Sequence, residues 1–171
     1  MWLLVFKTNL LQQQITLFSI VLPLLHIVVP FAYFYWAYRV KLISDIDITQ
    51  RTQRFGLMSL MLILQLISLA LIYFYGNPGL LYLSFIMTCV FAVIFSITLF
   101  WKISLHMTIN TIGILLVNVI YNWEHLWLLL CLPLVMWSRL YLKKHTFAQL
   151  VAGTGITALI MMAGFSYFNF I

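Results

Sequence analysis

Two histidines, His106 and His145, are the residues best suited to chemistry, and they lie in separate polar segments of an apolar chain. Ser104 precedes the first histidine, and Ser138 and Arg139 precede the second. A guanidinium can donate two parallel hydrogen bonds to phosphate oxygens. An imidazole can act as a nucleophile or move a proton near neutral pH. These residue types indicate a site that binds an anion, and a phosphorylated substrate is such an anion.

The third polar segment, residues 138–149, carries the most specific pattern, SRLYLKKHTFAQ. It resembles the third signature of the type 2 phosphatidic acid phosphatase superfamily, which reads Ser-Arg, five residues, His, three residues, Asp. Gln149 stands where the family usually has the aspartate. Residues 104–106, SLH, resemble the second signature, Pro-Ser-Gly-His, and keep its serine and histidine.

The first signature of that family, Lys, six residues, Arg-Pro, is absent. Residues 45–54, DIDITQRTQR, instead resemble the variant Asp-x-Asp-x-x-x-Arg-x-x-Arg of some small prokaryotic members. The resemblance extends from about Arg39 to Gly155, with the three motifs in the family's order. It implies a membrane-embedded lipid phosphatase.

The resemblance also implies roles for individual residues. His145 would be the nucleophile that forms a phosphohistidine, and His106 would be the general acid that protonates the leaving group. The phosphate would be held by Arg139, Ser138, Ser104, Arg51 and Arg54, with Lys102, outside the strict motif, adding positive charge.

Gln149 lies four residues after His145, so on a helix the two side chains share one face. The Gln149 carbonyl can accept the imidazole N–H and fix the tautomer, but it cannot stabilise an imidazolium as a carboxylate does. Asp45 or Asp47 can supply that carboxylate. Alternatively, each aspartate caps a helix or pairs with Arg51.

The elements that must position these residues are membrane helices. The chain has 171 residues, of which 65% are hydrophobic and 7% charged, which excludes an ordinary soluble domain. Apolar runs predict spans near residues 15–38, 55–75, 80–101, 104–121, 123–137 and 146–171, with a possible interfacial helix over 1–14. We therefore expect an all-α, polytopic bundle of about six transmembrane helices, forming a single domain over residues 1–171.

Eight of the nine basic residues lie in connections that six spans would place on one side of the membrane. The positive-inside rule explains such a distribution by insertion alone and predicts a cytoplasmic motif face. The alternative explanation is that the three basic loops converge on one site that binds an anion. The resemblance favours the outer face, where many relatives act. The basic residues outside the predicted phosphate site, mainly Arg39, Lys41, Lys143 and Lys144, favour the cytoplasm, and we predict that the motif face is cytoplasmic.

We therefore predict a phosphatase of the prokaryotic inner or plasma membrane that hydrolyses a polyprenyl or glycerolipid phosphate or diphosphate. No clustered carboxylates or Cys/His set suggests a metal site, so we expect no metal and no cofactor. The basic residues that give the net charge of +6 are separated by apolar runs, so membrane lipids and not nucleic acids are the expected partners. The oligomeric state is not indicated.

Two other classes of function stay open. In a small transporter or channel the charged loops would only set topology, but no predicted span carries Asp, Glu, Lys or Arg near its middle. A catalytically inactive family member acting as a scaffold would account for Gln149 and the missing first signature.

Overall fold

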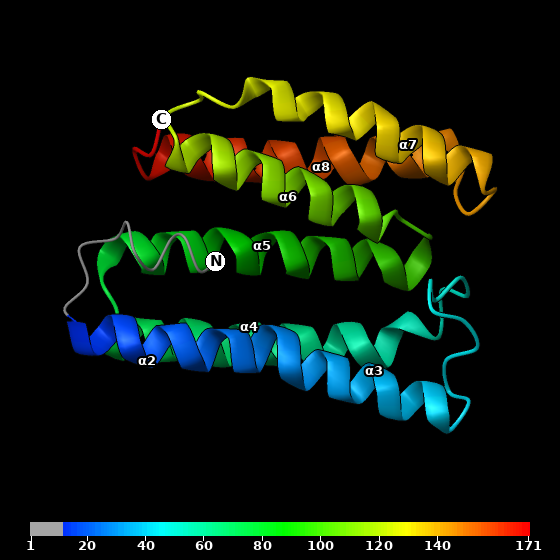
Figure 1. The fold of residues 1–171 in the computed structure, drawn as a ribbon, viewed down its shortest axis with the longest axis horizontal. Helices are drawn as coiled ribbons and strands as arrows, with labels where there is room; N and C mark the ends of the chain where they lie inside the picture. The colour runs from blue at the N-terminus through cyan, green and yellow to red at the C-terminus, as the bar shows by residue number, and fades with distance from the viewer. Residues whose placement is uncertain (1–11) are drawn as a thin grey trace. The chain divides into compact units, whose positions relative to one another are not determined.

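The computed structural model describes residues 12–171, and these residues form helices and connections without any strand. The helix bounds are α2 Gln12–Pro23, η1 Leu24–Val28, α3 Val29–Arg39, α4 Arg54–Tyr75, α5 Pro78–Phe100, α6 Leu105–Ile120, η2 Leu126–Leu130, α7 Cys131–Tyr141 and α8 Phe147–Tyr167 (Figure 1). The predicted all-α fold is confirmed. Most of the predicted interfacial helix, over 1–14, lies outside the described residues.

Four helical segments are long and apolar enough to cross a membrane, which identifies the chain as a membrane protein. They are Gln14–Arg39, Arg54–Tyr75, Pro78–Phe100 and Phe147–Tyr167. Two further apolar helical segments, Leu105–Ile120 and Leu126–Tyr141, are shorter. The helical segment in the fifth predicted span, Leu126–Tyr141, begins and ends later than residues 123–137. It continues past Trp137 and includes Arg139, whose side chain is buried.

The chain divides into two compact units, residues up to Phe95 and residues from Ser96 onward. In the first unit, α2, the π-helical η1 and α3 form one continuous helical segment that packs against α4. Phe18, Leu22, Ile72 and Leu80 form a buried apolar cluster in this unit. A second cluster, of Ala37, Ile43 and Ile48, anchors the connection between α3 and α4.

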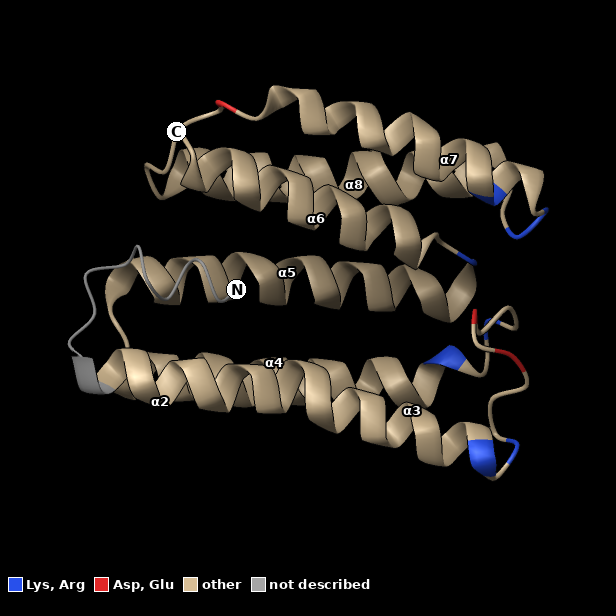
Figure 2. Ribbon diagram, in the orientation of Figure 1, with Lys and Arg blue, Asp and Glu red and all other residues tan. Residues whose placement is uncertain are grey.

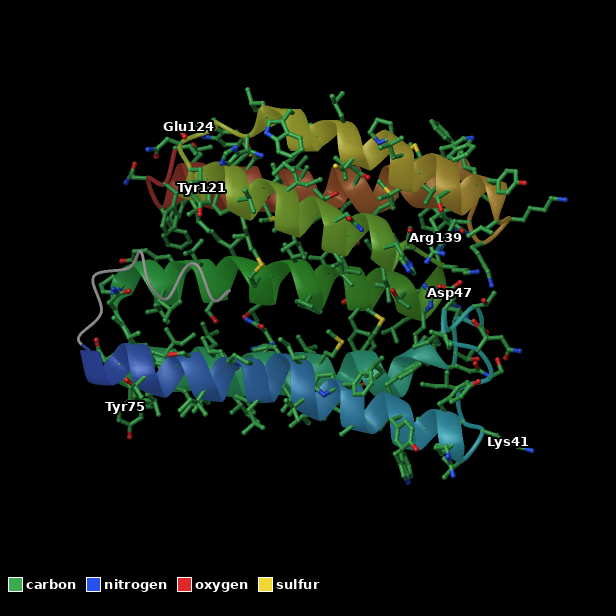
Figure 3. The ribbon with its side chains drawn as sticks, in the orientation of Figure 1. Lys41, Asp47, Tyr75, Tyr121, Glu124 and Arg139 are labelled. Atoms are coloured by element: carbon green, nitrogen blue, oxygen red, sulfur yellow. The ribbon has the colours of Figure 1, made fainter. Side chains whose placement is uncertain are left out.

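In the second unit α6 packs against both α7 and α8. Gly153, a residue of α8, permits the close contact between α8 and α6, since a Cβ on Gly153 would lie 2.7 Å from the Ser104 carbonyl oxygen at the start of α6. Basic residues of this unit gather before α6 and at the connection from α7 to α8 (Figure 2). Glu124 lies at the other end of the unit from Arg139 (Figure 3).

The helices α3 and α7 end in the same way. Lys41 follows α3 with φ 62°, and Lys143 follows α7 with φ 51°, a left-handed conformation that glycine usually adopts at this position. The amides of Lys41 and Lys143 donate to the carbonyls of Tyr38 and Leu140, at 3.2 and 2.9 Å. Both ends therefore carry the Schellman arrangement with a lysine at its left-handed residue.

Candidate functional site

The second unit brings the second and third predicted motifs together. The start of α6, the end of α7 and the start of α8 meet there. The Ser104 amide donates to the Gln149 carbonyl at 3.3 Å, which joins the starts of α6 and α8. Arg139, in the last turn of α7, contacts His106 in the first turn of α6. Residues far apart in the sequence thus form one polar cluster.

Arg139 is buried, and its guanidinium Nη2 hydrogen-bonds to Nε2 of His106. A guanidinium has donors and no acceptor, so Nε2 of His106 must be the acceptor in this pair. The proton of the neutral ring then lies on Nδ1. In this arrangement His106 faces Arg139 as a neutral base.

His145 is buried, and its Nδ1 lies 3.0 Å from Oε1 of Gln149. The same oxygen accepts the backbone N–H of Thr146 at 3.2 Å, which fixes the orientation of the amide with its oxygen toward both donors. Nδ1 of His145 is therefore a donor, and in the neutral ring the lone pair then lies on Nε2. A neutral imidazole in this tautomer can attack an electrophilic phosphorus.

The pair lies at the beginning of α8, and local sequence explains why that helix begins there. Thr146 is the N-cap residue, and its hydroxyl accepts the Gln149 amide at 3.4 Å. The Gln149 side chain bonds back to the Thr146 amide, which completes a capping box. The residue that orients His145 is thus held by the helix start itself.

An open pocket with a volume of about 410 Å³ adjoins His145. Its lining consists of Lys102, Leu140, Lys143, Lys144, His145, Thr146 and Gln149. The ammonium of Lys102 donates to the Lys144 carbonyl at 2.9 Å, which ties the segment before α6 to the connection between α7 and α8. Three lysines at one pocket make it suited to an anion.

The two predicted serines have local structural contacts. Ser104 is fully buried, and its hydroxyl caps α6 by accepting the Met107 amide at 3.4 Å. Ser138 is half-buried in α7, and its carbonyl accepts the Leu142 amide at 3.0 Å. Phosphate binding by either hydroxyl stays a prediction.

The predicted first-motif residues all lie in the first unit. The Asp45 carboxylate accepts the Thr49 amide at 3.1 and 3.2 Å and the Thr49 hydroxyl at 2.9 Å, so it closes a turn. Arg54 is buried and its Nε donates to the Ile48 carbonyl at 2.8 Å. The guanidinium of Arg51 lies 5.7 Å from the centre of the Phe55 ring.

These contacts are local to the connection between α3 and α4. Asp47 lies half-buried in the same connection. The orienting role predicted for Asp45 or Asp47, and the phosphate-binding role predicted for Arg51 and Arg54, stay predictions.

Two features of the cluster were missed by sequence reasoning. The Arg139–His106 pair joins two helices, and no local spacing indicates such a contact. Lys143 and Lys144 were treated only as loop charges, although they line the pocket beside His145. Their position directly before the histidine was the available signal.

Among residues 12–171, no three or more His, Cys, Asp or Glu side chains are grouped so that they could hold a metal ion. Comparison of the chain with family models, curated proteins and solved structures finds no match.

Proposed function

We propose that the chain is a membrane phosphatase that hydrolyses a lipid phosphate or diphosphate through a phosphohistidine intermediate. One observation carries the proposal: Gln149 holds the His145 ring in the tautomer whose Nε2 is a nucleophile, at the rim of a pocket lined by lysines. Arg139 and His106, the other two groups that phosphoryl transfer needs, lie in the same polar cluster.

In the first step, Nε2 of His145 forms a bond to phosphorus as the bond from phosphorus to the leaving oxygen breaks. The Nδ1 proton stays on the ring and faces Gln149, which positions the developing cation. Arg139 neutralises charge on the equatorial phosphate oxygens, which is the main task of the protein in such a reaction. Water then attacks the phosphohistidine, releases phosphate and restores the free imidazole.

His106 has a separate task in this scheme. When the leaving group is an alkoxide, the oxygen needs a proton as the bond breaks. The Arg139 guanidinium must then turn toward the substrate, so that Nε2 of His106 can bind a proton and deliver it. Binding of the substrate to Arg139 and protonation of His106 are therefore linked.

The lipid nature of the substrate is supported by the position of the cluster. His106, Arg139 and His145 lie at the ends of apolar helices, and α8 is long enough to span a membrane. A site at such helix ends can receive a headgroup while the acyl or prenyl chain stays in the bilayer. Soluble phosphate esters would not gain that apolar contact.

The test is phosphate release by the purified protein from phosphatidic acid and from a polyprenyl phosphate and diphosphate in mixed micelles, with EDTA present. We expect turnover by the wild type and a loss of at least about 1,000-fold in H145A, because the nucleophile is removed. H125A is the matched control, since His125 lies near Tyr121 at the far end of the same unit.

Rapid quenching with substrate labelled in the phosphoryl group supplies a second readout. The wild type and H125A should carry acid-labile, base-stable phosphate, and H145A should carry none. Full activity of a correctly folded H145A protein would overturn the mechanism. The absence of phosphate release from all three lipids by the wild type would instead favour an inactive scaffold or a transporter.

A further inference from the structure

The pocket beside His145 holds more positive charge than one phosphate needs. A phosphate monoester carries about 1.5 to 2 negative charges at pH 7. Arg139 already supplies one guanidinium to the cluster, and Lys102, Lys143 and Lys144 add three ammonium groups at the pocket. A substrate with a second ionised phosphate matches this charge better than a monophosphate does.

The lysines are held in place by the backbone around them. The amide of Lys143 bonds to Leu140, and the amide of Lys144 bonds to the Arg139 carbonyl at 3.1 Å. The Lys102 ammonium holds the Lys144 carbonyl from the opposite side of the connection. Backbone and side-chain hydrogen bonds therefore hold the turn that carries Lys143 and Lys144 next to His145.

The state of His106 points in the same direction. Its Nε2 faces the Arg139 guanidinium, so that nitrogen is directed at a donor and not at a leaving oxygen. An alkoxide leaving group would need a proton. A lipid monophosphate leaving from a diphosphate does not, because its conjugate acid has a pKa of only about 6.

We infer that the pocket lined by Lys102, Lys143 and Lys144 binds one phosphate of a lipid diphosphate, and that the protein prefers lipid diphosphates to monophosphates. This inference rests on the proposed phosphatase function. Nε2 of His145 bonds to the terminal phosphorus while the bond to the bridging oxygen breaks. The bridging oxygen keeps the electron pair and leaves on the lipid monophosphate. Water then cleaves the phosphohistidine, and inorganic phosphate carries away the proton released.

The two Schellman ends provide a matched pair of variants. K143G removes an ammonium from the pocket and places glycine where the backbone favours it. K41G makes the same change at the same kind of helix end in the first unit. Each variant removes one basic residue from a connection that follows an odd-numbered span of the six predicted ones. The two variants should therefore affect membrane topology alike.

The first measurement compares kcat/KM for a monophosphate and a diphosphate that carry the same C15 isoprenoid chain. We expect the wild type and K41G to prefer the diphosphate by at least about tenfold, the value of one strong charge-assisted contact. K143G should narrow that ratio to about twofold, mainly by losing activity on the diphosphate. Equal wild-type activity on both lipids, or an equal loss on both in K143G, overturns the inference while leaving the phosphatase function intact.

The second measurement is independent of turnover. Calorimetric titration should show that inorganic diphosphate binds about tenfold more tightly than inorganic phosphate to the wild type and to K41G, but not to K143G. Such binding without hydrolysis of any lipid would support the pocket as a diphosphate site and refute the proposed function. Hydrolysis of inorganic diphosphate as fast as of the lipid diphosphate would overturn the assignment to a lipid.

Discussion

The side-chain oxygen of Gln149 accepts two hydrogen bonds, from Nδ1 of His145 and from the backbone of Thr146. A glutamate at this position can keep both bonds, and capping boxes accept Glu as readily as Gln. Its charge also suits the first turn of a helix, by about 0.3 to 1 kcal/mol. We expect Q149E to match or exceed the wild type in thermal stability in detergent. Its rate of phosphate release should rise, because a carboxylate stabilises the imidazolium that forms on attack.

Q149A is the companion variant at the same residue. Losing the bond from the Thr146 amide to the Gln149 side chain, which is one half of the capping box, should lower the free energy of unfolding by about 1 kcal/mol. Losing the acceptor for Nδ1 should lower kcat about tenfold, because the ring can then adopt the wrong tautomer. A stability loss without any change in kcat would mean that Gln149 serves only the helix.

At this scale, sequence spacing predicts contacts within one helix and misses contacts between helices. The predicted contact of His145 with Gln149 is present, although His145 precedes the N-cap residue Thr146 and is not itself helical. The contact of Arg139 with His106 spans 33 residues and depends on how α6 and α7 pack, which no spacing rule encodes. Lys102 and the Lys144 carbonyl, 42 residues apart, are a second example.

The spacing of α6 and α8 is set by a glycine. A Cβ on Gly153 would lie 2.7 Å from the Ser104 carbonyl oxygen and 3.2 Å from the Met107 Cβ, whereas Gly155 has nothing within 4 Å. G153A should therefore push the two helix starts apart and cost about 1 to 3 kcal/mol of stability. Phosphate release should fall with it, because His106 lies in α6 and His145 lies directly before α8.

G155A is the control for the same helix and the same substitution. We expect it to be neutral or to stabilise by at most about 1 kcal/mol, as alanine has the higher helix propensity. Thermal unfolding in detergent and kcat distinguish the two variants. Equal behaviour of G153A and G155A would contradict the view that Gly153 sets the distance between α6 and α8.

The elements themselves were largely predictable, since long apolar runs in a membrane protein have to be helices. Hydropathy could not distinguish the π-helical turns of η1 or the 3-10 turns of η2 from α-helix, because the residues in them are as apolar as those of the neighbouring α-helices. The end of α7 was placed too early for a related reason. Hydropathy treats Arg139 as a residue of a solvated loop, whereas the fold buries it against His106.

The topology of the whole chain depends on α6 and on the segment Leu126–Tyr141, which are the short apolar helices. A helix of 16 residues, such as α6, is about 24 Å long, against about 30 Å for the hydrocarbon core. If both short segments cross the membrane, Glu124 lies on the opposite side from Lys143. If neither crosses, Glu124 and Lys143 share a side. Lys41 shares the side of Lys143 in either case.

Single cysteines at these three positions test that topology after Cys89 and Cys131 are replaced by alanine. The excess of basic residues predicts that K41C and K143C face the cytoplasm. An impermeant thiol reagent should therefore label E124C in intact cells, and label K41C and K143C only after permeabilisation. Labelling of K143C in intact cells would place the pocket on the outer face. Protection of E124C together with K143C would show that α6 and α7 do not cross.

The order of the chain also has a consequence for biosynthesis. Synthesis proceeds from the N-terminus at roughly 5 to 20 residues per second, so α6 and α7 leave the ribosome before α8 does. Gly153 and Gln149, which contact Ser104, belong to α8. His106 and Arg139 can pair as soon as their two helices are inserted, but His145 acquires its oriented ring only when α8 forms. A nascent chain therefore cannot carry out the proposed chemistry until α8 has been made.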